Sequence, residues 1–412
     1  MPWKRMAVDD QRMQFVIRAM SGKERLAGLC REFGISRPTG YLWRKRYLET
    51  RSLCDLVEHS RRPQRSPRRT ATDKEQRVVE ARQETGWGAK KLRVVLRDEE
   101  QLVLPVRTIH RILARHELVR GDVHAAAPQR FARSVPNELW QMDTKGKYQL
   151  ADGQCHALCI EDDHSRYAVG VYALPVLSME QAHPCIVNTF RTCGLPEAML
   201  MDHGPLWWAS SNGWGLTWLS LRLIEQGIRL LYGRVAHPQT QGKVERLHRT
   251  LGEAMQHRGM PRRFAAWPAA VAEFQSSYNN RRPHEAIGLR RPRELYQPSP
   301  RRYQEQPKPW EYPEGSDVRR VNVNGAIAEG GRKWFVCEAL AGQLVRVERF
   351  DGKLLVSHRH MYIREINLER GTTQATVVAR SAPAAEPAPV ALRATSAGSA
   401  EQKSNKRRTA KV

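Results

Sequence analysis

The sequence predicts a multidomain protein with an all-α amino-terminal part, an α/β core built on a mixed sheet, and a small β-barrel. Three patterns support this fold class. Apolar side chains recur at helical spacing up to about residue 118, strand patterns then give way to alternating helices and strands, and short strands with glycine turns follow from residue 317. At 412 residues the chain is too long for one compact core, so several domains are expected.

The composition favours a polyanionic partner. The chain has 68 Lys and Arg against 43 Asp and Glu, a net charge of +25, and residues 1–135 hold 30 of the basic and 16 of the acidic residues. No run approaches the roughly 18 apolar residues of a membrane span, and the first residues lack the apolar segment of a signal peptide. Seven cysteines without a CxxC pair argue against a disulfide framework or a zinc ribbon. We therefore expect a reducing bacterial cytosol and no membrane partner.

Residues 8–50 predict three short helices. Leu26 and Leu29 are spaced as on one helix face, Gly34 follows as a helix-ending glycine, and Ser36 can cap the next helix. A helix, a turn of about three to four residues and a second helix match helix-turn-helix spacing. The alternative is a helical hairpin with a solvated basic face. DNA contacts are expected from polar side chains of the second helix, namely Arg37, Thr39, Arg44 and Lys45.

A second helix-turn-helix is expected after a linker rich in Pro, Ser and Arg. Its last helix, VRTIHRILARHEL, places Ile109, Ile112 and Leu113 on one side, as a buried face requires. Further DNA contacts are expected from the other side of that helix, namely from Arg107 and Arg111.

From about residue 136 the pattern changes to strands. Three segments up to about residue 176 alternate or run apolar, with turn residues between them, which predicts an antiparallel meander. There follow a helix over 178–193, a buried strand ending at Asp202, a helix over roughly 215–227, the strand IRLLYG and a helix after HPQTQG. This order predicts an α/β domain with a mixed sheet.

The carboxyl-terminal region predicts hairpins and a tail. Asn324-Gly325, Gly330-Gly331 and Asp351-Gly352 are hairpin signals between short strands, and the tail is rich in Ala, Pro, Ser and Thr. The predicted order is a helix-turn-helix domain over 1–58, a basic linker over 59–72, a second helix-turn-helix domain over 73–120, a linker over 121–135, the core over 136–300, a linker over 301–316, a small β-barrel over 317–368 and a disordered basic tail over 369–412.

Three acidic residues fall at informative places in the predicted core. Asp143 lies in or just after the first strand, Asp202 ends a buried strand, and Glu245 lies in the helix after HPQTQG, beside its apolar face. That face is formed by Val244, Leu247, Leu251 and Met255. Converging carboxylates repel one another unless a cation neutralises them, and a few oxygen ligands describe Mg²⁺ or Mn²⁺. We expect the three acids to bind two such ions for phosphodiester chemistry.

Other interpretations of the acids remain open. Glu245 alone fits a surface residue paired with Arg249 four positions on, an interaction worth only about 0.3–0.5 kcal/mol. Asp162 and Asp163 are rival acids, but they fall in a turn between strands, where Asp is favoured for local reasons.

Residues 136–300 resemble the integrase core of DDE transposases from bacterial insertion sequences. The matching segments are LWQMDTKG, CIEDDHSRY, MDHGP, AHPQTQGKVERLHRTL and YNNRRPHEAIGLRRPRELY. The resemblance implies a ribonuclease-H-like fold in which Asp143, Asp202 and Glu245 are catalytic and bind the metal. Together with the helix-turn-helix segments it spans about residues 10–300.

Residues around the acids are expected to support the site. His203 stands where the family usually has Asn, and Gln241 precedes the helix of Glu245. Asp202 and Glu245 are 43 residues apart, which is longer than usual in the family and fits extra loop residues near 210–218. Basic side chains of that helix are expected to hold DNA phosphates near the metals, namely Lys243, Arg246, His248 and Arg249.

The function implied by the resemblance is that of a DNA transposase. The amino-terminal domains would bind the terminal inverted repeats of the element, and the core would cleave the 3′ ends and join them to target DNA by in-line phosphoryl transfer. A homo-oligomer assembled on double-stranded DNA at the bacterial nucleoid is expected. The alternatives are a catalytically weakened DNA-binding regulator, which His203 supports best, and a nuclease of the same fold without strand transfer.

Overall fold

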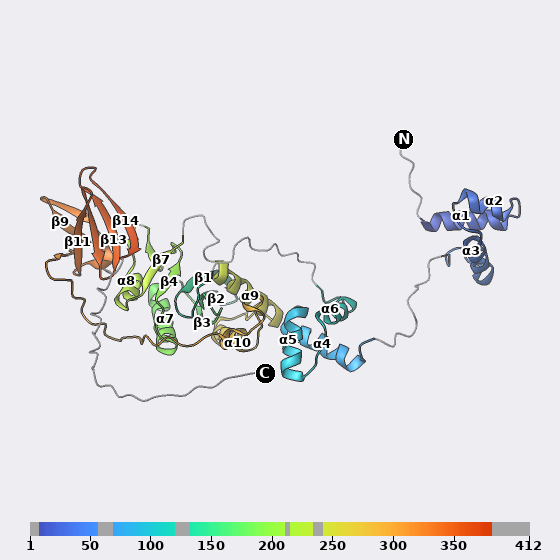
Figure 1. Cartoon of the computed structure of the whole chain (residues 1–412), viewed down its shortest axis with the longest axis horizontal. Helices are drawn as coiled ribbons and strands as arrows, with labels where there is room; N and C mark the ends of the chain where they lie inside the picture. Colours follow the sequence, from blue (N-terminus) through green and yellow to red (C-terminus); the bar gives the residue numbers. More distant parts are fainter. Residues whose placement is uncertain (1–7, 57–68, 120–131, 211–214, 234–241, 381–412) are drawn as a thin grey trace, which may run out of the picture. The chain divides into compact units, whose positions relative to one another are not determined.

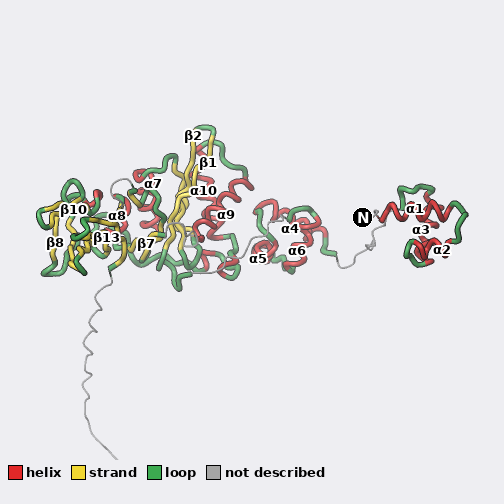
Figure 2. The backbone as a smooth tube through the Cα atoms, turned by 90° about the horizontal axis from the view of Figure 1, so that it is seen from above, coloured by secondary structure: helices red, strands yellow, loops and turns green. Residues whose placement is uncertain are grey.

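The chain forms two compact units, Met1–Ala71 and Thr72–Val412. The computed structural model describes residues 8–56, 69–119, 132–210, 215–233 and 242–380. Figure 1 labels the elements along the chain, and Figure 2 distinguishes helices from strands. None of the helices within these ranges combines the length and the apolar character needed to cross a membrane.

The first unit contains a small helical core. Its helices are α1 (Val8–Met20), α2 (Leu26–Glu32) and α3 (Arg37–Thr50). Phe15 and Leu29 pack with Trp43 in the centre. Gly34 has a φ of +64° at the end of α2, and the Ser36 hydroxyl accepts the amide N–H of Thr39 at 3.3 Å to cap α3. The predicted helices and their turn are confirmed.

The second unit begins with three more helices. These are α4 (Thr72–Thr85), α5 (Ala89–Glu100) and α6 (Val106–Arg115). As predicted, α6 buries Ile109, Ile112 and Leu113, which pack with apolar side chains of α4 and α5. Glu75 of α4 is buried and is bonded to Arg115 at the end of α6, so an ion pair adds to this packing.

A five-stranded mixed sheet forms the centre of the second unit. Its strands are β1 (Trp140–Leu150), β2 (Gly153–Asp162), β3 (Ala168–Leu174), β4 (Ala198–Met201) and β7 (Arg229–Tyr232), in the order β3-β2-β1-β4-β7. The first three form the predicted antiparallel meander. β4 pairs in parallel with β1 and β7 in parallel with β4, so the predicted mixed sheet is confirmed.

Helices cover both faces of this sheet. Along β2, Leu158 and Ile160 belong to one apolar cluster and Ala157 and Cys159 to another, because successive strand residues point to opposite faces. The first cluster includes side chains of α7 (Met179–Cys193) and α8 (Trp218–Glu225), and the second includes side chains of α9 (Gly242–Arg258) and α10 (Trp267–Asn280). The sheet is therefore a buried layer between two helical layers.

The carboxyl-terminal strands form an open antiparallel sheet, which corrects the predicted β-barrel. They are β8 (Asp317–Arg320), β11 (Leu344–Phe350), β12 (Lys353–His358), β13 (Met361–Asn367) and β14 (Thr372–Ala379), in the order β14-β13-β12-β11-β8, beside a hairpin of β9 (Ala326–Glu329) and β10 (Arg332–Phe335). Among the described strands, β8 and β14 each have one neighbour. Glycine turns predict hairpins, but closure depends on how the edge strands pair, which turns do not encode.

β14 also corrects the predicted tail. The sequence predicts disorder from residue 369, but Thr372–Ala379 pair with β13 in an antiparallel ladder. β14 also lies against β7 of the central sheet. A covered edge strand is protected from unwanted pairing without barrel closure, which explains why the sheet can stay open on this side.

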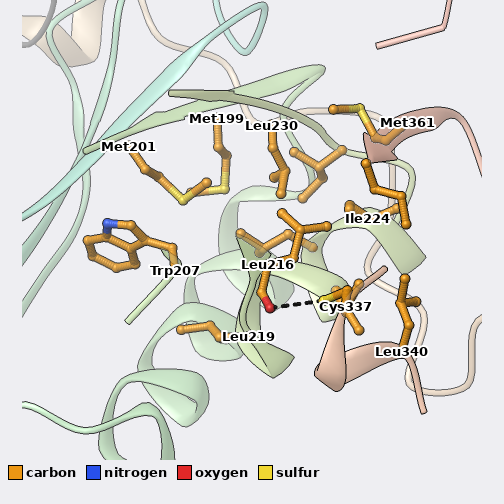
Figure 3. Close-up of a cluster of buried hydrophobic side chains, with 14 of the residues drawn as sticks. Met199, Met201, Trp207, Leu216, Leu219, Ile224, Leu230, Cys337, Leu340 and Met361 are labelled. Carbon is orange, nitrogen blue, oxygen red and sulfur yellow. Dashed lines mark hydrogen bonds between the residues drawn. The ribbon is translucent and has the colours of Figure 1, made fainter. Parts of the chain in front are cut away.

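The central sheet and the carboxyl-terminal sheet share one apolar cluster. In Figure 3, Cys337, Leu340 and Met361 lie beside Leu216 and Leu230. The Cys337 thiol donates a hydrogen bond to the Leu216 carbonyl at 3.3 Å. The two sheets are thus parts of a continuous core rather than separately packed domains.

Candidate active site

The parallel register of β1 and β4 brings Asp143 and Asp202 together. Trp140 pairs with Met199 and Gln141 with the next residue of β4. If this pairing continues for two more residues, Asp143 lies beside Asp202, which directly follows β4. Two acids far apart in the sequence therefore meet at the end of β4.

Glu245 comes to this place from the first turn of α9. Val244 and Leu247 are fully buried, as the predicted helix face requires, whereas Glu245 is exposed. The Val244 amide donates to the Gln141 side chain at 3.4 Å, which ties the start of α9 to β1. A carboxylate in the first turn of a helix is also favoured by the helix dipole. We call Asp143, Asp202 and Glu245 the edge acids.

The edge acids act on one another electrostatically. The Asp143 side chain is 17% exposed, and its Oδ1 accepts the Thr144 amide N–H at 2.7 Å. Burial raises the pKa of Asp143 to about 7, and the charges of Asp202 and Glu245 raise it as well. Because such effects need nearby charges, Asp202 and Glu245 lie close enough to Asp143 to act on its carboxyl group.

The edge acids have the ligand chemistry of a hard divalent cation, although their side chains are not arranged as a metal site in this structure. Carboxylate oxygens are the ligands that Mg²⁺ and Mn²⁺ prefer, and a cation would remove the repulsion that raises the pKa of Asp143. Within the described ranges, no group of three or more His, Cys, Asp or Glu side chains is arranged to hold a metal ion.

Asp202 is oriented by a residue that was not identified from the sequence. Its Oδ1 accepts the Gly204 amide N–H at 2.8 Å and the Trp207 indole N–H at 2.6 Å. Trp207 is fully buried in the core, so the indole is held in place by packing. The sequence signal was a tryptophan five positions after the acid, since a buried indole N–H usually finds an acceptor.

The two predicted supporting residues differ in outcome. The His203 ring packs edge-on against Trp208, with ring centroids 4.8 Å apart, and lies 5.4 Å from the ring of Tyr232. His203 therefore belongs to an aromatic cluster next to Asp202. Gln241 lies outside the described residues.

His248 does not hold DNA phosphates, which corrects its predicted role. Its side chain is 8% exposed, and Nδ1 lies 3.6 Å from Asp143 Oδ2. Burial lowers the pKa of His248 to about 4, so the imidazole is neutral at pH 7. Among the described residues Nε2 has no hydrogen-bond partner. His248 lines the inner side of the site instead.

Lys243 is also turned inward, away from the predicted phosphate contact. Its ammonium group pairs with Asp163 Oδ1 at 2.5 Å, and Asp163 is fully buried. Asp163 also accepts hydrogen bonds from the Arg133 amide at 2.7 Å and from the Gln141 side chain at 2.8 Å. The rival acid thus has a structural explanation.

Asp162 is likewise explained by local hydrogen bonds. Its carboxylate accepts the Asn137 amide N–H at 2.7 Å, the Ser165 amide N–H at 2.8 Å and the Ser165 hydroxyl at 2.6 Å. These bonds close the turn after β2, as expected of Asp at such a position.

Most of the predicted DNA-contacting side chains are exposed. Besides the buried His248, Thr39 and Lys243 are the exceptions. Thr39 is half-buried and hydrogen-bonded to Ser36, and Lys243 is half-buried and paired with Asp163. In the first unit, Lys45 lies 3.7 Å from Glu49 on the surface of α3. The exposed set is Arg37, Arg44 and Lys45 on α3, Arg107 and Arg111 on α6, and Arg246 and Arg249 on α9.

Two domain families match the chain. A homeodomain-like domain matches residues 39–113, which begin in α3 and end in α6. An integrase core domain matches residues 226–292, which include Glu245 but neither Asp143 nor Asp202. The order β3-β2-β1-β4-β7, with helices on both faces, is consistent with the ribonuclease-H-like fold of integrase cores.

Three solved structures are weakly similar to the chain. The HTLV-2 integrase catalytic core domain in complex with magnesium covers 39% of this chain and 97% of its own in a dimeric form (TM-score 0.30), and 40% and 98% in a trimeric form (TM-score 0.31), both at 14% identity. A simian T-cell lymphotropic virus intasome in complex with PP2A regulatory subunit B56 gamma covers 74% and 99%, with 14% identity and a TM-score of 0.37. Likenesses this low carry no argument about function. The two domain matches, a homeodomain-like domain followed by an integrase core, fit a DDE transposase or integrase.

Proposed function

We propose that the protein is a DNA transposase that binds the terminal inverted repeats of its element, cleaves their 3′ ends and joins them to target DNA. The integrase-core match supports the reaction class. The observation that supports the proposal is that the β1–β4 register sets Asp143 beside Asp202, while Asp202 and Glu245 both raise the pKa of Asp143. Their described partners are amide N–H groups, an indole and the neutral imidazole of His248, so the fold does not use these carboxylates to neutralise cations.

The edge acids would hold two Mg²⁺ or Mn²⁺ ions. Bound there, such ions would supply activation of the attacking hydroxyl and stabilisation of the leaving oxygen of a phosphodiester. The chain's own residues position these groups. Trp207 and the Gly204 amide fix one oxygen of Asp202, which leaves the other for a ligand, and the start of α9 directs Glu245 to the same place.

DNA would be bound on several surfaces. Exposed arginines of α9, Arg246 and Arg249, are close enough in sequence to Glu245 to hold phosphates beside the reacting bond. The exposed basic side chains of α3 and α6 would contact the element ends in the first and second units respectively. Because two ends must be joined, a homo-oligomer assembled on DNA at the bacterial nucleoid is part of the proposal.

Strand transfer tests this function directly. The native protein is incubated with duplexes cut from the DNA that flanks its gene, a plasmid target and Mg²⁺ or Mn²⁺. Joined products are expected from the native protein and not from Glu245→Gln. The matched control is Glu180→Gln, since Glu180 is an exposed glutamate in the first turn of α7 and should remain active.

The second candidate is a catalytically weakened DNA-binding regulator, which His203 favours because its ring is engaged with Trp208 and Tyr232. Specific binding of the flanking duplexes without cleavage or joining in either metal would support the regulator and contradict the transposase. Cleavage without joining would indicate a nuclease instead.

A further inference from the structure

A cavity of about 720 Å³ lies within the second unit, between its first helices and α9. It is lined by the turn between α4 and α5, by residues at both ends of α6, by α9 and by the segment after α10. Lys91 of α5 and Arg282, which follows α10, both line the cavity. Neither residue is among those expected from the sequence to contact DNA.

Lys91 and Arg282 are half-buried cations without a bonded anion. In the described part of the chain, neither side chain forms an ion pair or donates a hydrogen bond, and the Arg282 guanidinium lies over the Trp87 ring at 5.7 Å. Burial lowers the pKa of Lys91 to about 8, and the charge of Arg282 is the next cause. Burial also lowers the pKa of Arg282.

Their sequence neighbours are paired, which makes the contrast clear. Arg281 donates to Glu84 and Glu99, and these bonds raise its pKa. Lys90 pairs with Glu285 at 2.9 Å. Each unpaired cation is therefore adjacent to a paired one on the same backbone. A partly desolvated charge without a partner is unfavourable, and an anion bound between Lys91 and Arg282 would reduce that cost.

Other groups around the cavity complete its electrostatics. Glu285 and Glu253 also line the cavity and raise the pKa of Lys91, but both are exposed and the effect of each is smaller than that of Arg282. Arg246 of α9 is close enough to lower the pKa of Lys91 further. The amino end of α5, capped by Gly88 without a side-chain bond, also lines the cavity, and such ends favour anions.

We propose that this cavity binds a phosphodiester group of the substrate DNA, held by Lys91, Arg282 and the amino end of α5. The proposal rests on the proposed function for the identity of its ligand. Thr250 and Glu253 of α9 line the cavity and Glu245 lies earlier on the same helix, so a strand whose phosphate occupies the cavity would run along α9 toward the edge acids. Inorganic phosphate offers the same chemistry, and the experiment separates the two sources.

The first measurement is the salt dependence of DNA binding by the full chain. The dissociation constant for a duplex cut from the gene's flank is measured over a range of NaCl concentrations. Each lost phosphate contact should reduce the slope of log affinity against log salt by about 0.9. We expect this reduction for Lys91→Gln and for Arg282→Gln. The control Arg93→Gln removes an exposed cation two positions further along α5, outside the cavity lining, and should leave the slope less changed.

The second measurement identifies the phosphate. A neutral methylphosphonate is placed at each backbone position of the duplex in turn. At one position the methylphosphonate should lower the affinity of the native protein several-fold. The same methylphosphonate should not lower the affinity of Lys91→Gln, because this variant already lacks the phosphate contact. If inorganic phosphate raises the unfolding temperature of the native protein but not of Lys91→Gln, and no methylphosphonate position shows this coupling, the DNA assignment is overturned.

Thermal unfolding without DNA provides the structural control. Lys91→Gln should keep or raise the unfolding temperature, since it removes a desolvated charge. A lower unfolding temperature with an unchanged salt slope would make Lys91 a structural cation balanced by Glu253 and would overturn the proposal. Strand transfer is read separately. If the native protein does not join DNA ends but the coupling between Lys91 and one methylphosphonate position is observed, the proposed reaction is contradicted and the proposed phosphate site is supported.

Discussion

Two groups of acids in the second unit have opposite surroundings. The edge acids have few donors, and one of them, Glu245, is exposed. A second group, which we call the interior acids, lies at the end of β2 and is almost completely buried. It consists of Glu161, Asp162 and Asp163.

The interior acids show what a structural carboxylate requires. Asp163 is satisfied by an ammonium group, an amide side chain and a backbone N–H, and Asp162 by three donors of its own turn. Glu161 differs, because one of its oxygens accepts the Tyr278 hydroxyl and the other has no partner among the described residues. Folding therefore explains Asp162 and Asp163, because each of these buried charges has partners. It does not explain Asp143, which is mostly buried beside two other acids. The comparison shows that uncompensated charge, rather than acidity alone, marks the candidate site.

The largest expected effect is the loss of an interior acid. Asp163→Asn leaves Lys243 without its carboxylate and turns an amide N–H₂ toward existing donors. We expect the free energy of unfolding to fall by about 3–5 kcal/mol, as when one partner of a buried ion pair is removed. Urea unfolding measures it. The matched edge variant, Asp143→Asn, should unfold at the same or a higher urea concentration and lose strand transfer. Equal destabilisation of both variants would remove the distinction between the two groups.

The second expected effect separates a basic residue of α9 that pairs with an interior acid from one that is exposed. Lys243→Met leaves Asp163 buried with hydrogen bonds but no cation, so the free energy of unfolding should fall by about 2–3 kcal/mol. Arg249→Met, at an exposed position of the same helix, should change it by less than about 0.5 kcal/mol and weaken DNA binding. If Lys243→Met leaves the free energy of unfolding unchanged, the ion pair is dispensable, and a DNA-contacting role for Lys243 is favoured again.

The third effect concerns the orientation of Asp202. Trp207→Phe keeps an aromatic ring in the core but removes the indole N–H that Asp202 accepts. We expect stability to fall by about 1–2 kcal/mol and the Mg²⁺ concentration for half-maximal strand transfer to rise. Trp208→Phe is the control, because the Trp208 indole nitrogen has no hydrogen-bond partner among the described residues. An equal shift in the metal requirement of both variants would attribute the effect to packing.

Periodicity in the sequence was sufficient for the central elements. The alternation along β2 and the spacing of Val244, Leu247 and Leu251 predict which faces are buried, and the structure agrees. The position of Asp202 followed from the end of a predicted strand. Asp143, expected in or just after the first strand, lies inside β1 at the place that the parallel register sets beside Asp202. The buried faces and the ends of these elements depend on local sequence patterns, so they can be predicted from a single sequence.

Contacts between distant segments could not be predicted in this way. Lys243 and His248 looked like members of one basic stripe, but each borders the buried face of α9, and what packs there comes from β1 and the turn after β2. The open form of the carboxyl-terminal sheet was not predicted for the same reason. Its glycine turns are local signals, whereas the packing of Cys337 against Leu216 depends on two surfaces far apart in the chain.

The fourth expected effect is a pH dependence that belongs to one of the interior acids. Burial raises the pKa of Glu161 to about 8, and its carboxyl group accepts the Tyr278 hydroxyl at 2.9 Å. Between the unfolded pKa near 4.3 and this value, the folded state keeps a proton that the unfolded state releases. Stability from this group therefore falls as pH rises, with a slope of at most about 1.4 kcal/mol per pH unit.

Glu161→Gln should remove this slope while keeping an acceptor for Tyr278. Urea unfolding of the native protein and the variant is compared at several pH values from 5 to 8, a window in which Gln does not titrate. The stability of the variant relative to the native protein should rise with pH. Glu273→Gln, at an exposed position of α10, should follow the native curve. Parallel curves for Glu161→Gln would mean that Glu161 is ionised in the folded protein, and the interior acids would then include an uncompensated charge of the kind that distinguishes the edge acids.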